Sequence, residues 1–242
     1  MRTLLVASST DPAGSRLMAA LGDRMIPGVE RLVVDASLLD WSVPHGFDLV
    51  IFLSKHQAAS GIAAMCVHSV GNFGTARFGG RDGMLVDTHP GILSSLFRSL
   101  RDREPSTALG TYTVSLEAVH HGPYSTTPSI FFELGSAREH WEDVDAARIM
   151  AEVLIDVFEQ PRPQHESFFG IGSNHYCAAF EPIIDEFDFA GSCAKHSLAD
   201  LSAEHVDWIE QRVDRIIVDS GSLGSQKQRI KSLLEEREVE WV

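Results

Sequence analysis

The chain has 242 residues, a hydrophobic content of 44% and a formal net charge of −14. The length suits one larger α/β domain, and the composition is that of an ordinary globular protein. The negative charge argues against a surface that binds nucleic acids of any sequence, although it is compatible with a small local cationic patch.

Membrane and disulfide signals are missing from the sequence. No apolar run approaches the length of a bilayer-spanning helix, and the apolar stretch at the N-terminus is too short for a signal peptide. The cysteines Cys66, Cys177 and Cys193 are widely spaced and odd in number, which favours reduced thiols over a disulfide framework or a CxxC zinc site. We therefore expect a cytoplasmic protein that binds neither membranes nor DNA.

Strands and helices alternate along the chain in the hydrophobic pattern. Apolar runs predict strands at residues 3–7, 31–35, 48–54, 63–68, 111–119, 130–134, 167–171 and 215–218. Amphipathic spacing predicts helices after residue 14, from Pro90 to about 103, from about 141 to 158, after Ser202, and from 225 to 237. Residues 180–190 have a mixed pattern, and 191–196 are predicted to be a loop before a helix. The pattern indicates one α/β domain over residues 1–242, with a mixed, mostly parallel sheet covered on both faces.

Two neighbouring strand ends carry polar residues in their following loops. Lys55 and His56 follow the strand at 48–54, and His68 and Asn72 follow or end the next one. Ligands of open α/β sheets bind just beyond the carboxyl ends of strands, and Gly71 would let the backbone approach a bound group. A solvated lysine and a histidine satisfied within its strand are the alternatives. The glycine fingerprints of nucleotide-binding loops are absent, which disfavours a common nucleotide fold.

A pair of histidines ends the strand at 111–119. Adjacent strand residues point to opposite faces, so His120 and His121 can enter one site only if the strand breaks there, and the Gly122-Pro123 turn supplies a break. Glu133 lies in a following apolar strand and needs a partner if it is buried. Imidazoles and a carboxylate at strand ends are typical of a hydrolytic site, with a histidine pair that merely caps the strand edge as the alternative.

A third strand end repeats this context. His175 and Tyr176 follow the strand at 167–171 and its glycines. Independent core histidines have no reason to recur beside glycine at three sheet edges. We therefore predict that the three segments converge on one polar cleft at one rim of the sheet.

As a set, these segments resemble the D-aminoacyl-tRNA deacylase family of archaea and plants. The resemblance covers nearly the whole chain in order, through SKHQAASG, VHSVGNF, EAVHHGP with PSIFFELGS, GIGSNHY and KQRIKSLLEE. It implies hydrolysis of the ester between a D-amino acid and the terminal ribose of tRNA, and a three-layer α/β/α fold of the phosphorylase/hydrolase type. It also implies zinc. The matched motif positions are Lys55, His56, Ser60, His68, Gly71, Asn72, His120, His121, Gly122, Pro123, Glu133, His175 and Tyr176.

The sequence departs from the family pattern at two places. Residues 173 and 174 are Ser-Asn, where Gly-Thr or a similar small pair is expected, and Ser192 stands where a histidine is expected after Gly191. If that histidine is a ligand or a base in relatives, one metal position or one catalytic role is missing here.

The site prediction follows from the chemistry of an aminoacyl ester, which needs a positioned water, a base and oxyanion donors. We predict that His120 or His121 activates water, that Glu133 orients an imidazole, and that amides near Gly71 and Gly122 bind the oxyanion. The predicted catalytic residues are His120, His121, Glu133 and His175. The predicted substrate-binding residues are Lys55, His56, Ser60, His68, Gly71, Asn72, Gly122 and Tyr176.

A zinc-bound hydroxide is the competing mechanism, and the resemblance alone suggests the metal. Its candidate ligands are His56, His68, His120, His121 and His175, because no spaced motif such as HExxH selects among them. Two other functions remain open: a zinc-dependent peptidase or amidohydrolase on a related fold, and a non-catalytic module that grips the acceptor end of tRNA. The partner that we expect is D-aminoacyl-tRNA, bound by a monomer.

Overall fold

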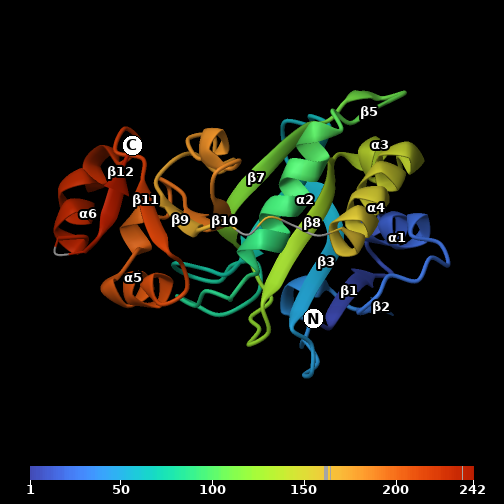
Figure 1. The fold of residues 1–242 in the computed structure, drawn as a ribbon, viewed down its shortest axis with the longest axis horizontal. Helices are drawn as coiled ribbons and strands as arrows, with labels where there is room; N and C mark the ends of the chain where they lie inside the picture. Colours follow the sequence, from blue (N-terminus) through green and yellow to red (C-terminus); the bar gives the residue numbers. More distant parts are fainter. Residues whose placement is uncertain (161–162, 164, 236) are drawn as a thin grey trace.

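The computed structural model describes residues 1–160, 163, 165–235 and 237–242. Its larger sheet has six strands in the spatial order β2, β1, β3, β8, β4, β7 (Figure 1). All neighbouring strands are parallel except β8 and β4, which are antiparallel. The six strands are β1 (Thr3–Ser8), β2 (Val29–Val34), β3 (Leu49–Gln57), β4 (Ala64–Val70), β7 (Thr113–His120) and β8 (Ser129–Ser136).

Helices lie on both sides of this sheet. One face is covered by the main helices, which bury their apolar sides together with the strand residues beneath them. These helices are α1 (Pro12–Ala20), α2 (Pro90–Asp102), the short α3 (Arg138–Trp141) and α4 (Val144–Glu159). The other face is packed by the 3₁₀ helix η1 (Leu38–Asp40) and by loops, around Phe52 and Phe131. The predicted α/β fold with a mixed, mostly parallel sheet is therefore confirmed.

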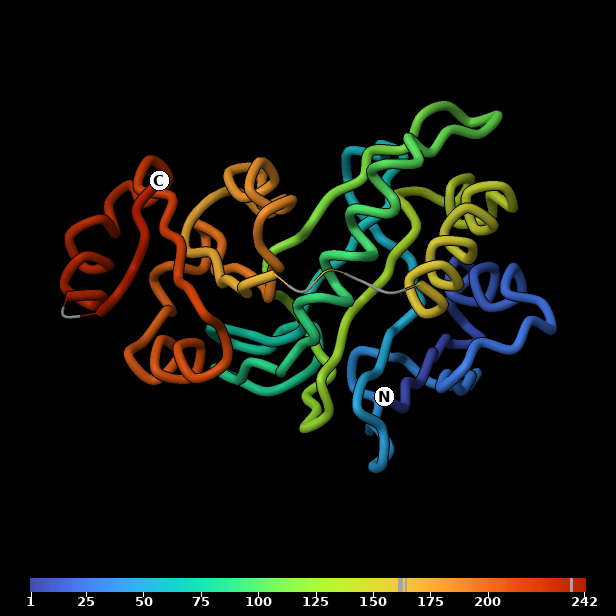
Figure 2. Tube along the Cα trace, viewed as in Figure 1, coloured from blue at the N-terminus to red at the C-terminus, as the bar shows by residue number. Residues whose placement is uncertain are grey.

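A second, all-parallel sheet of four strands lies beside β7, in the order β10, β9, β11, β12 (Figure 1). The C-terminal part of the chain that forms it is orange to red in Figure 2. Phe168, Phe180 and Phe189 of this region belong to the same apolar core as α2 and α4. The elements of this part are β9 (Ser167–Ile171), β10 (Asp188–Cys193), α5 (Ala203–Glu210), β11 (Arg215–Val218), α6 (Lys227–Leu233) and β12 (Val239–Trp241), with short 3₁₀ turns at Glu181–Ile183, Leu198–Asp200 and Gly224–Gln226. A separate hairpin of two short strands, β5 (Ser106–Thr107) and β6 (Gly110–Thr111), precedes β7 and belongs to neither of the larger sheets.

Three local expectations were wrong or incomplete. The first half of the predicted loop at 191–196 belongs to β10, whose small residues have weak strand propensity but are buried beside β9. The helix expected after it is only the 3₁₀ turn at Leu198–Asp200. The last predicted helix, 225–237, is shorter as α6, and Glu236 lies outside the described residues. A single domain over 1–242 stays a prediction.

No helix among the described residues is long and apolar enough to span a bilayer.

Candidate active site

Four neighbouring strands carry the polar side chains of the site. In the β3–β8 register Ser54 pairs with Glu133, and in the β4–β7 register His68 pairs with Glu117. Cys66 lies opposite Glu133 across the β4–β8 pair. Cross-strand partners share a face of a sheet. The strand order thus places two carboxylates on the same face of an otherwise apolar sheet, Glu133 on one side of β4 and Glu117 on the other.

The sequence analysis expected Lys55 and His56 in a loop. They lie inside β3 instead, because this strand continues to Gln57. Likewise His68 lies within β4, two residues before its end. Both histidines are buried, His68 fully. Gly135 allows β8 to pack closely against β3 at His56, since a Cβ at this glycine would lie 2.1 Å from the carbonyl oxygen of His56.

A β-bulge in β7 brings both His120 and His121 to the site that contains His68. Between His68 and Val70 of β4, strand β7 gains one residue, so that His120 pairs with Val70. The strand then ends, and His121 adopts a left-handed φ of 47°, which is uncommon for a non-glycine residue. The ring centroids of His120 and His121 lie 4.2 and 4.9 Å from that of His68. Both members of the pair therefore face one site.

His175 reaches this site from the second sheet. Its Nε2 atom lies 3.4 Å from a carboxylate oxygen of Glu117, and its ring centroid is 4.8 Å from that of His120. The preceding Ser173 has a φ of 68°, a conformation that glycine adopts most easily, which explains why a glycine is expected there. Ser173 is held by the Ala179 amide, which donates to its Oγ.

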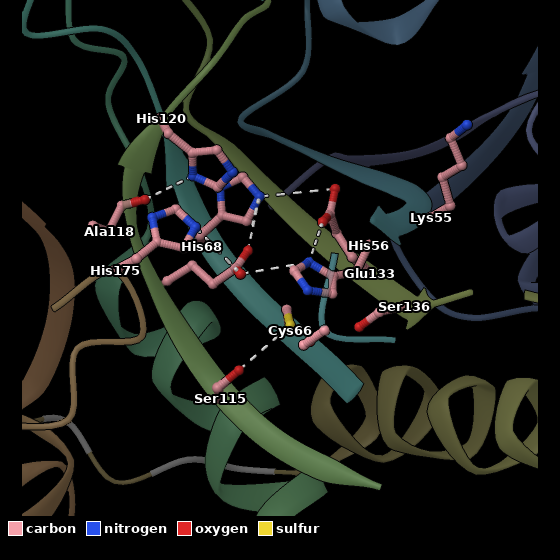
Figure 3. A network of polar contacts seen from close by, with 12 residues as sticks. Lys55, His56, Cys66, His68, Ser115, Ala118, His120, Glu133, Ser136 and His175 are labelled. Atoms are coloured by element: carbon pink, nitrogen blue, oxygen red, sulfur yellow. Dashed lines mark hydrogen bonds and ion pairs between the residues drawn. The ribbon is translucent and has the colours of Figure 1, made fainter. Parts of the chain in front are cut away.

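We call these converging residues the polar cluster: His56, His68, Glu117, His120, His121, Glu133 and His175. The Nδ1 atom of His56 lies 3.4 Å from Glu117 and 3.6 Å from Glu133. The Nε2 atom of His68 lies 4.0 Å from Glu117 and 3.8 Å from Glu133. Figure 3 shows the imidazoles and Glu133 directed toward one another, with Lys55 apart from them.

Several buried polar atoms of the cluster lack a hydrogen-bond partner among the described residues. They are both carboxylate oxygens of Glu117 and the Nε2 atoms of His56 and His68. Leaving a buried polar atom unpaired costs about 1–3 kcal/mol, and more for a charged group. Such a concentration of unpaired lone pairs indicates a site for a bound cation.

The histidine tautomers fit the same interpretation. The Nδ1 atoms of His68, His120 and His121 lie 2.8–3.0 Å from the backbone carbonyls of Ser69, Ala118 and Gly122. A carbonyl can only accept, so these contacts assign the proton to Nδ1 and leave the Nε2 lone pair free. A backbone carbonyl behind the ring is the usual arrangement of a metal-binding histidine.

The cluster contains overlapping donor sets that could hold a metal ion. In each set the donor atoms lie within 4.8 Å of one another. The sets are His68, His120 and His121; His56, Cys66 and Glu117; Glu117, His120 and His175; and His68, Glu117 and Glu133. Nitrogen, carboxylate and thiol donors together suit a transition metal such as zinc better than magnesium or calcium.

The histidines of the cluster fall into two groups, one with lowered and one with raised pKa. Burial, reinforced by the neighbouring His68, lowers the pKa of His121 to about 4, and burial with three adjacent imidazoles lowers the pKa of His120 well below its usual range. Burial also disfavours the charged form of His56 and His68, but Glu133 and Glu117 outweigh it and raise the pKa of both. The carboxylates thus favour a positive charge in the cluster, and a metal ion could provide that charge in place of a proton.

Glu133 is the counterpart of these two histidines. Burial alone would raise its pKa, but His56 and His68 outweigh burial and hold the pKa of Glu133 well below its usual range. Ser54 donates a hydrogen bond of 2.7 Å to Glu133 and fixes its orientation. Glu133 therefore lies beside Nδ1 of His56 and Nε2 of His68, where it could orient an imidazole, the role predicted for it.

A cleft of about 680 Å³ opens beside the cluster. Its inner wall includes His56, His120, His121, Glu133 and His175. The lining also includes residues from the end of β1, the β1–α1 loop and the start of η1, which offer hydroxyl and carboxylate groups from Ser8, Thr10, Asp11 and Ser37. A volume of this size is within the range of small-ligand sites, about 300–1,000 Å³.

Other predicted substrate residues lie outside the cleft. Ser60 is exposed on a turn and is not part of the cleft lining. Asn72 is buried and donates through Nδ2 to the Gly79 carbonyl, so it holds a loop and does not face a substrate. Tyr176 stands at the margin, with its ring centroid 5.4 Å from that of His175.

The predicted oxyanion donors are already engaged within the protein. The Gly71 amide donates to the His121 carbonyl, and the Gly122 amide donates to the Phe78 carbonyl. Each amide has a single hydrogen, which is already shared with a backbone carbonyl, so neither amide is free to donate to a substrate oxygen. Ser192, at the position where a histidine was expected, is buried with its Oγ 3.1 Å from the sulfur of Cys177.

Sequence reasoning missed Glu117, the centre of the cluster. The signal was available, because Glu117 is a lone carboxylate in an apolar strand, the same criterion that selected Glu133. Cys66 lies two residues before His68 and therefore on the same face, which the period of a strand also indicates. Asp11 and Phe78, both in the cleft lining, gave no comparable signal.

Comparisons with known proteins agree on one family. A sequence model of the family D-aminoacyl-tRNA deacylase matches residues 43–242. The chain is 30% identical to a D-aminoacyl-tRNA deacylase of Cenarchaeum symbiosum, with 96% of each chain covered. It is 31% identical to that of Archaeoglobus fulgidus, covering 76% of this chain and 67% of the relative. With the enzyme of that name from Haloarcula marismortui it shares 36% identity over 68% of its own length but spans only 37% of the relative.

The fold has a similar solved counterpart. A crystal structure described as a conserved protein of unknown function, AF0625, matches with a TM-score of 0.86 and 26% identity. The match covers 99% of this chain and 94% of the other.

Proposed function

The chain belongs to the D-aminoacyl-tRNA deacylase family, and on that premise we propose that its polar cluster hydrolyses the ester joining a D-amino acid to the terminal ribose of tRNA. The products are free tRNA and the free D-amino acid, so the activity removes wrongly charged tRNA before translation uses it. The observation that carries this proposal is the convergence of five histidines and two carboxylates in one cluster, of which four histidines and Glu133 line the cleft.

We assign zinc to the cluster. Its proposed ligands come from His56, His68, Glu117, His120 and His175, whose donor atoms are close together and in part unpaired. A bound zinc ion would supply Lewis acidity for the ester carbonyl and for water. Cys66 completes one of the donor sets from beneath, where burial raises the pKa of its thiol.

His121 is the residue to which we assign orientation of the attacking water. It lines the cleft, and its Nδ1–H is held by the Gly122 carbonyl, which leaves Nε2 as an acceptor. Because its pKa is about 4, the ring keeps this lone pair throughout the neutral range. Glu133 acts as a positioning residue, since Ser54 donates to one of its oxygens and the other lies 3.6 Å from Nδ1 of His56.

The acceptor end of tRNA and the D-amino acid are the groups that we place in the cleft. Lys55 stands at its edge, where the Asp11 carboxylate accepts its backbone amide and the Trp141 ring lies 5.0 Å from its Nζ. This ammonium is suited to a ribose or phosphate oxygen. The hydroxyl-bearing wall of Ser8, Thr10 and Ser37 faces the remaining space and offers partners for the substrate ammonium and carbonyl. The monomeric state expected from the sequence stays a prediction.

A paired assay tests the activity. Turnover of D-Tyr-tRNA and L-Tyr-tRNA is measured with the purified chain, with and without a chelator, and the metal content is determined in parallel. We expect D-Tyr-tRNA to be hydrolysed far faster, and we expect the chelator to abolish turnover together with loss of zinc. Equal rates for the two substrates would overturn the chiral assignment, and full activity without metal would overturn the zinc assignment.

A variant pair tests the histidine. His121→Ala should lose at least about 100-fold in turnover while it retains tRNA binding, because positioned water typically contributes factors of 10²–10⁴. His45→Ala removes an exposed histidine outside the cleft and serves as the matched control. A His121→Ala protein with parental turnover would exclude this role.

A further inference from the structure

A short loop at the mouth of the cleft exposes an aromatic ring between two arginines. Phe78 lines the cleft and yet is 70% exposed, and Arg77 and Arg81 on either side of it are also exposed. A large apolar side chain in this position has no folding role, because its ring is not buried against the core. Because Phe78 lines the cleft, this exposed ring faces whatever enters the cleft.

The loop is held rigidly beside the polar cluster. The Gly122 amide donates a 3.0 Å hydrogen bond to the Phe78 carbonyl, and the Asn72 side chain donates to the Gly79 carbonyl. A Cβ at Gly79 would lie 2.0 Å from the Leu39 carbonyl oxygen, so this glycine, with a φ of 76°, permits the close approach. The backbone of Phe78 is thus tethered to the residue that follows His121, so its side chain starts from a fixed point beside the polar cluster.

The two arginines differ from most other arginines of the chain. Ten described arginines form ion pairs with carboxylates, including Arg98, Arg101 and Arg212. In the described part of the chain no carboxylate lies within ion-pair distance of Arg77 or Arg81, and the guanidinium of Arg81 stacks 4.1 Å over the Tyr124 ring. On a protein with a net charge of −14, these cations form a local patch at the cleft mouth.

We propose that this loop binds the single-stranded 3′ end of tRNA, with Phe78 stacked on the terminal adenine and Arg77 and Arg81 on the phosphates that precede it. The inference rests on the proposed function and specifies how its substrate is held. Stacking on an exposed aromatic ring together with cations along the backbone is how proteins hold single-stranded nucleic acid. Phe78 is tethered next to the cluster that attacks the ester, so the base it can reach is the one on the reacting ribose.

The chemistry also explains why an acidic protein needs this patch. A negatively charged surface repels the phosphate backbone, and unpaired guanidinium groups can bind phosphates without first breaking an internal ion pair. Asp82, in the same loop, accepts the Ala76 amide and so is committed to the loop backbone.

A double-mutant cycle between protein and RNA tests the stacking. The affinities of the full chain and of Phe78→Ala for uncharged tRNA are measured by fluorescence anisotropy, with tRNA that ends in CCA and with tRNA that lacks the terminal adenosine. Loss of a stacked base costs about 5- to 150-fold in affinity. We expect this loss for the parent when the adenosine is removed and for Phe78→Ala with intact tRNA, but little further loss when both are removed.

If the losses from the two changes simply add, Phe78 does not stack on the terminal adenine. Parental affinity of Phe78→Ala for intact tRNA would also overturn the stacking, and it is the result expected if the ring docks a protein. Phe78→Trp should restore the affinity, which a merely steric role would not predict. Met25→Ala, which removes a side chain that is 85% exposed elsewhere, is the control and should behave as the parent.

The arginines are tested through salt. Arg77→Gln with Arg81→Gln should weaken binding to both tRNAs alike and reduce the slope of log affinity against log salt by about 1–2, since each phosphate contact contributes about 0.7–0.9 to it. Arg148→Gln with Lys231→Gln removes the same charge from α4 and α6 and should leave the slope near the parental value. An unchanged slope in the first variant would overturn the phosphate contacts. These measurements use uncharged tRNA, so they stand even if deacylation itself fails.

Discussion

Two buried carboxylates, each on a β-strand, are held in opposite ways. Asp188 begins β10 and receives a 2.8 Å hydrogen bond from Arg98, whose guanidinium also donates to the carbonyls of Ile184 and Phe187. Glu117 in β7 is fully buried, yet neither of its oxygens has a hydrogen-bond partner among the described residues. Both carboxylates should cost stability when buried, but only Asp188 is compensated within the protein.

The difference separates a structural ion pair from a ligand site. A fold that leaves the oxygens of Glu117 without hydrogen bonds beside four histidines is suited to a cation, which could take the place of the protons that the carboxylates favour on His56 and His68. Changes at the two positions should therefore have opposite signatures in function and stability.

The largest effect is expected at Glu117. Glu117→Gln keeps the shape but removes the charge, and we expect metal content to fall and kcat/KM for D-aminoacyl-tRNA to drop by at least about 1,000-fold, more than the 10- to 100-fold typical of a residue behind the ligands. Stripped of metal, the variant should be at least as stable as the parent, because the unpaired buried charge is gone. Metal analysis and thermal unfolding in chelator measure both. A less stable metal-free variant would contradict the comparison.

Asp188 should show the reverse. Asp188→Asn leaves the guanidinium of Arg98 without a counter-charge in a largely buried position, and breaking such a pair costs about 3–5 kcal/mol in the free energy of unfolding. Metal content per folded molecule should stay parental. Asp185→Asn, in the exposed pair with Arg101, is the matched control and should cost under about 1 kcal/mol. Urea unfolding of the three proteins decides between these outcomes.

Gly135 links backbone packing to the cluster. Gly135→Ala places a Cβ against the His56 carbonyl, and we expect a loss of about 1–3 kcal/mol in stability from overpacking, with weaker metal binding because His56 is displaced. Gly221→Ala has an ordinary contact of 3.4 Å to Asp219 and should change neither property. Metal titration of both variants separates displacement of His56 from a general loss of stability. Parental metal affinity in Gly135→Ala would show that His56 is not a ligand.

The smallest effect is expected at Asp143, a partly exposed carboxylate whose oxygens accept hydrogen bonds. It caps α4, and although burial opposes ionisation, hydrogen bonds from Thr107, Tyr112 and two backbone amides lower its pKa. The folded pKa therefore lies below the unfolded value of about 3.9, so its contribution is complete above that pH and is lost as the pH falls through the folded pKa. Asp143→Ala should cost about 1 kcal/mol at pH 7 and progressively less toward pH 3. A cost that grows on acidification would refute this sign.

Local sequence patterns predicted much of the fold and part of the site. The alternation of strands and helices, the break after His120 and the recurrence of histidine beside glycine all follow from residue periodicity and turn chemistry. β10 escaped because its small residues form a strand only through burial beside β9. Ser60 and Asn72, both predicted to bind substrate, are not among the residues that line the cleft, because proximity in sequence to a strand end does not fix the direction of a side chain.

The amino-acid sequence by itself determined which groups are available: the histidine-bearing segments, the α/β pattern and the family to which the chain belongs. The tertiary structure alone decided that Glu117 stands at the centre of the cluster and that Phe78 stands at its mouth. The reason is that the order β3, β8, β4, β7 and the bulge before His120 arise from pairing between strands distant in sequence. No local pattern encodes which strands become neighbours, and in this protein that adjacency creates the site.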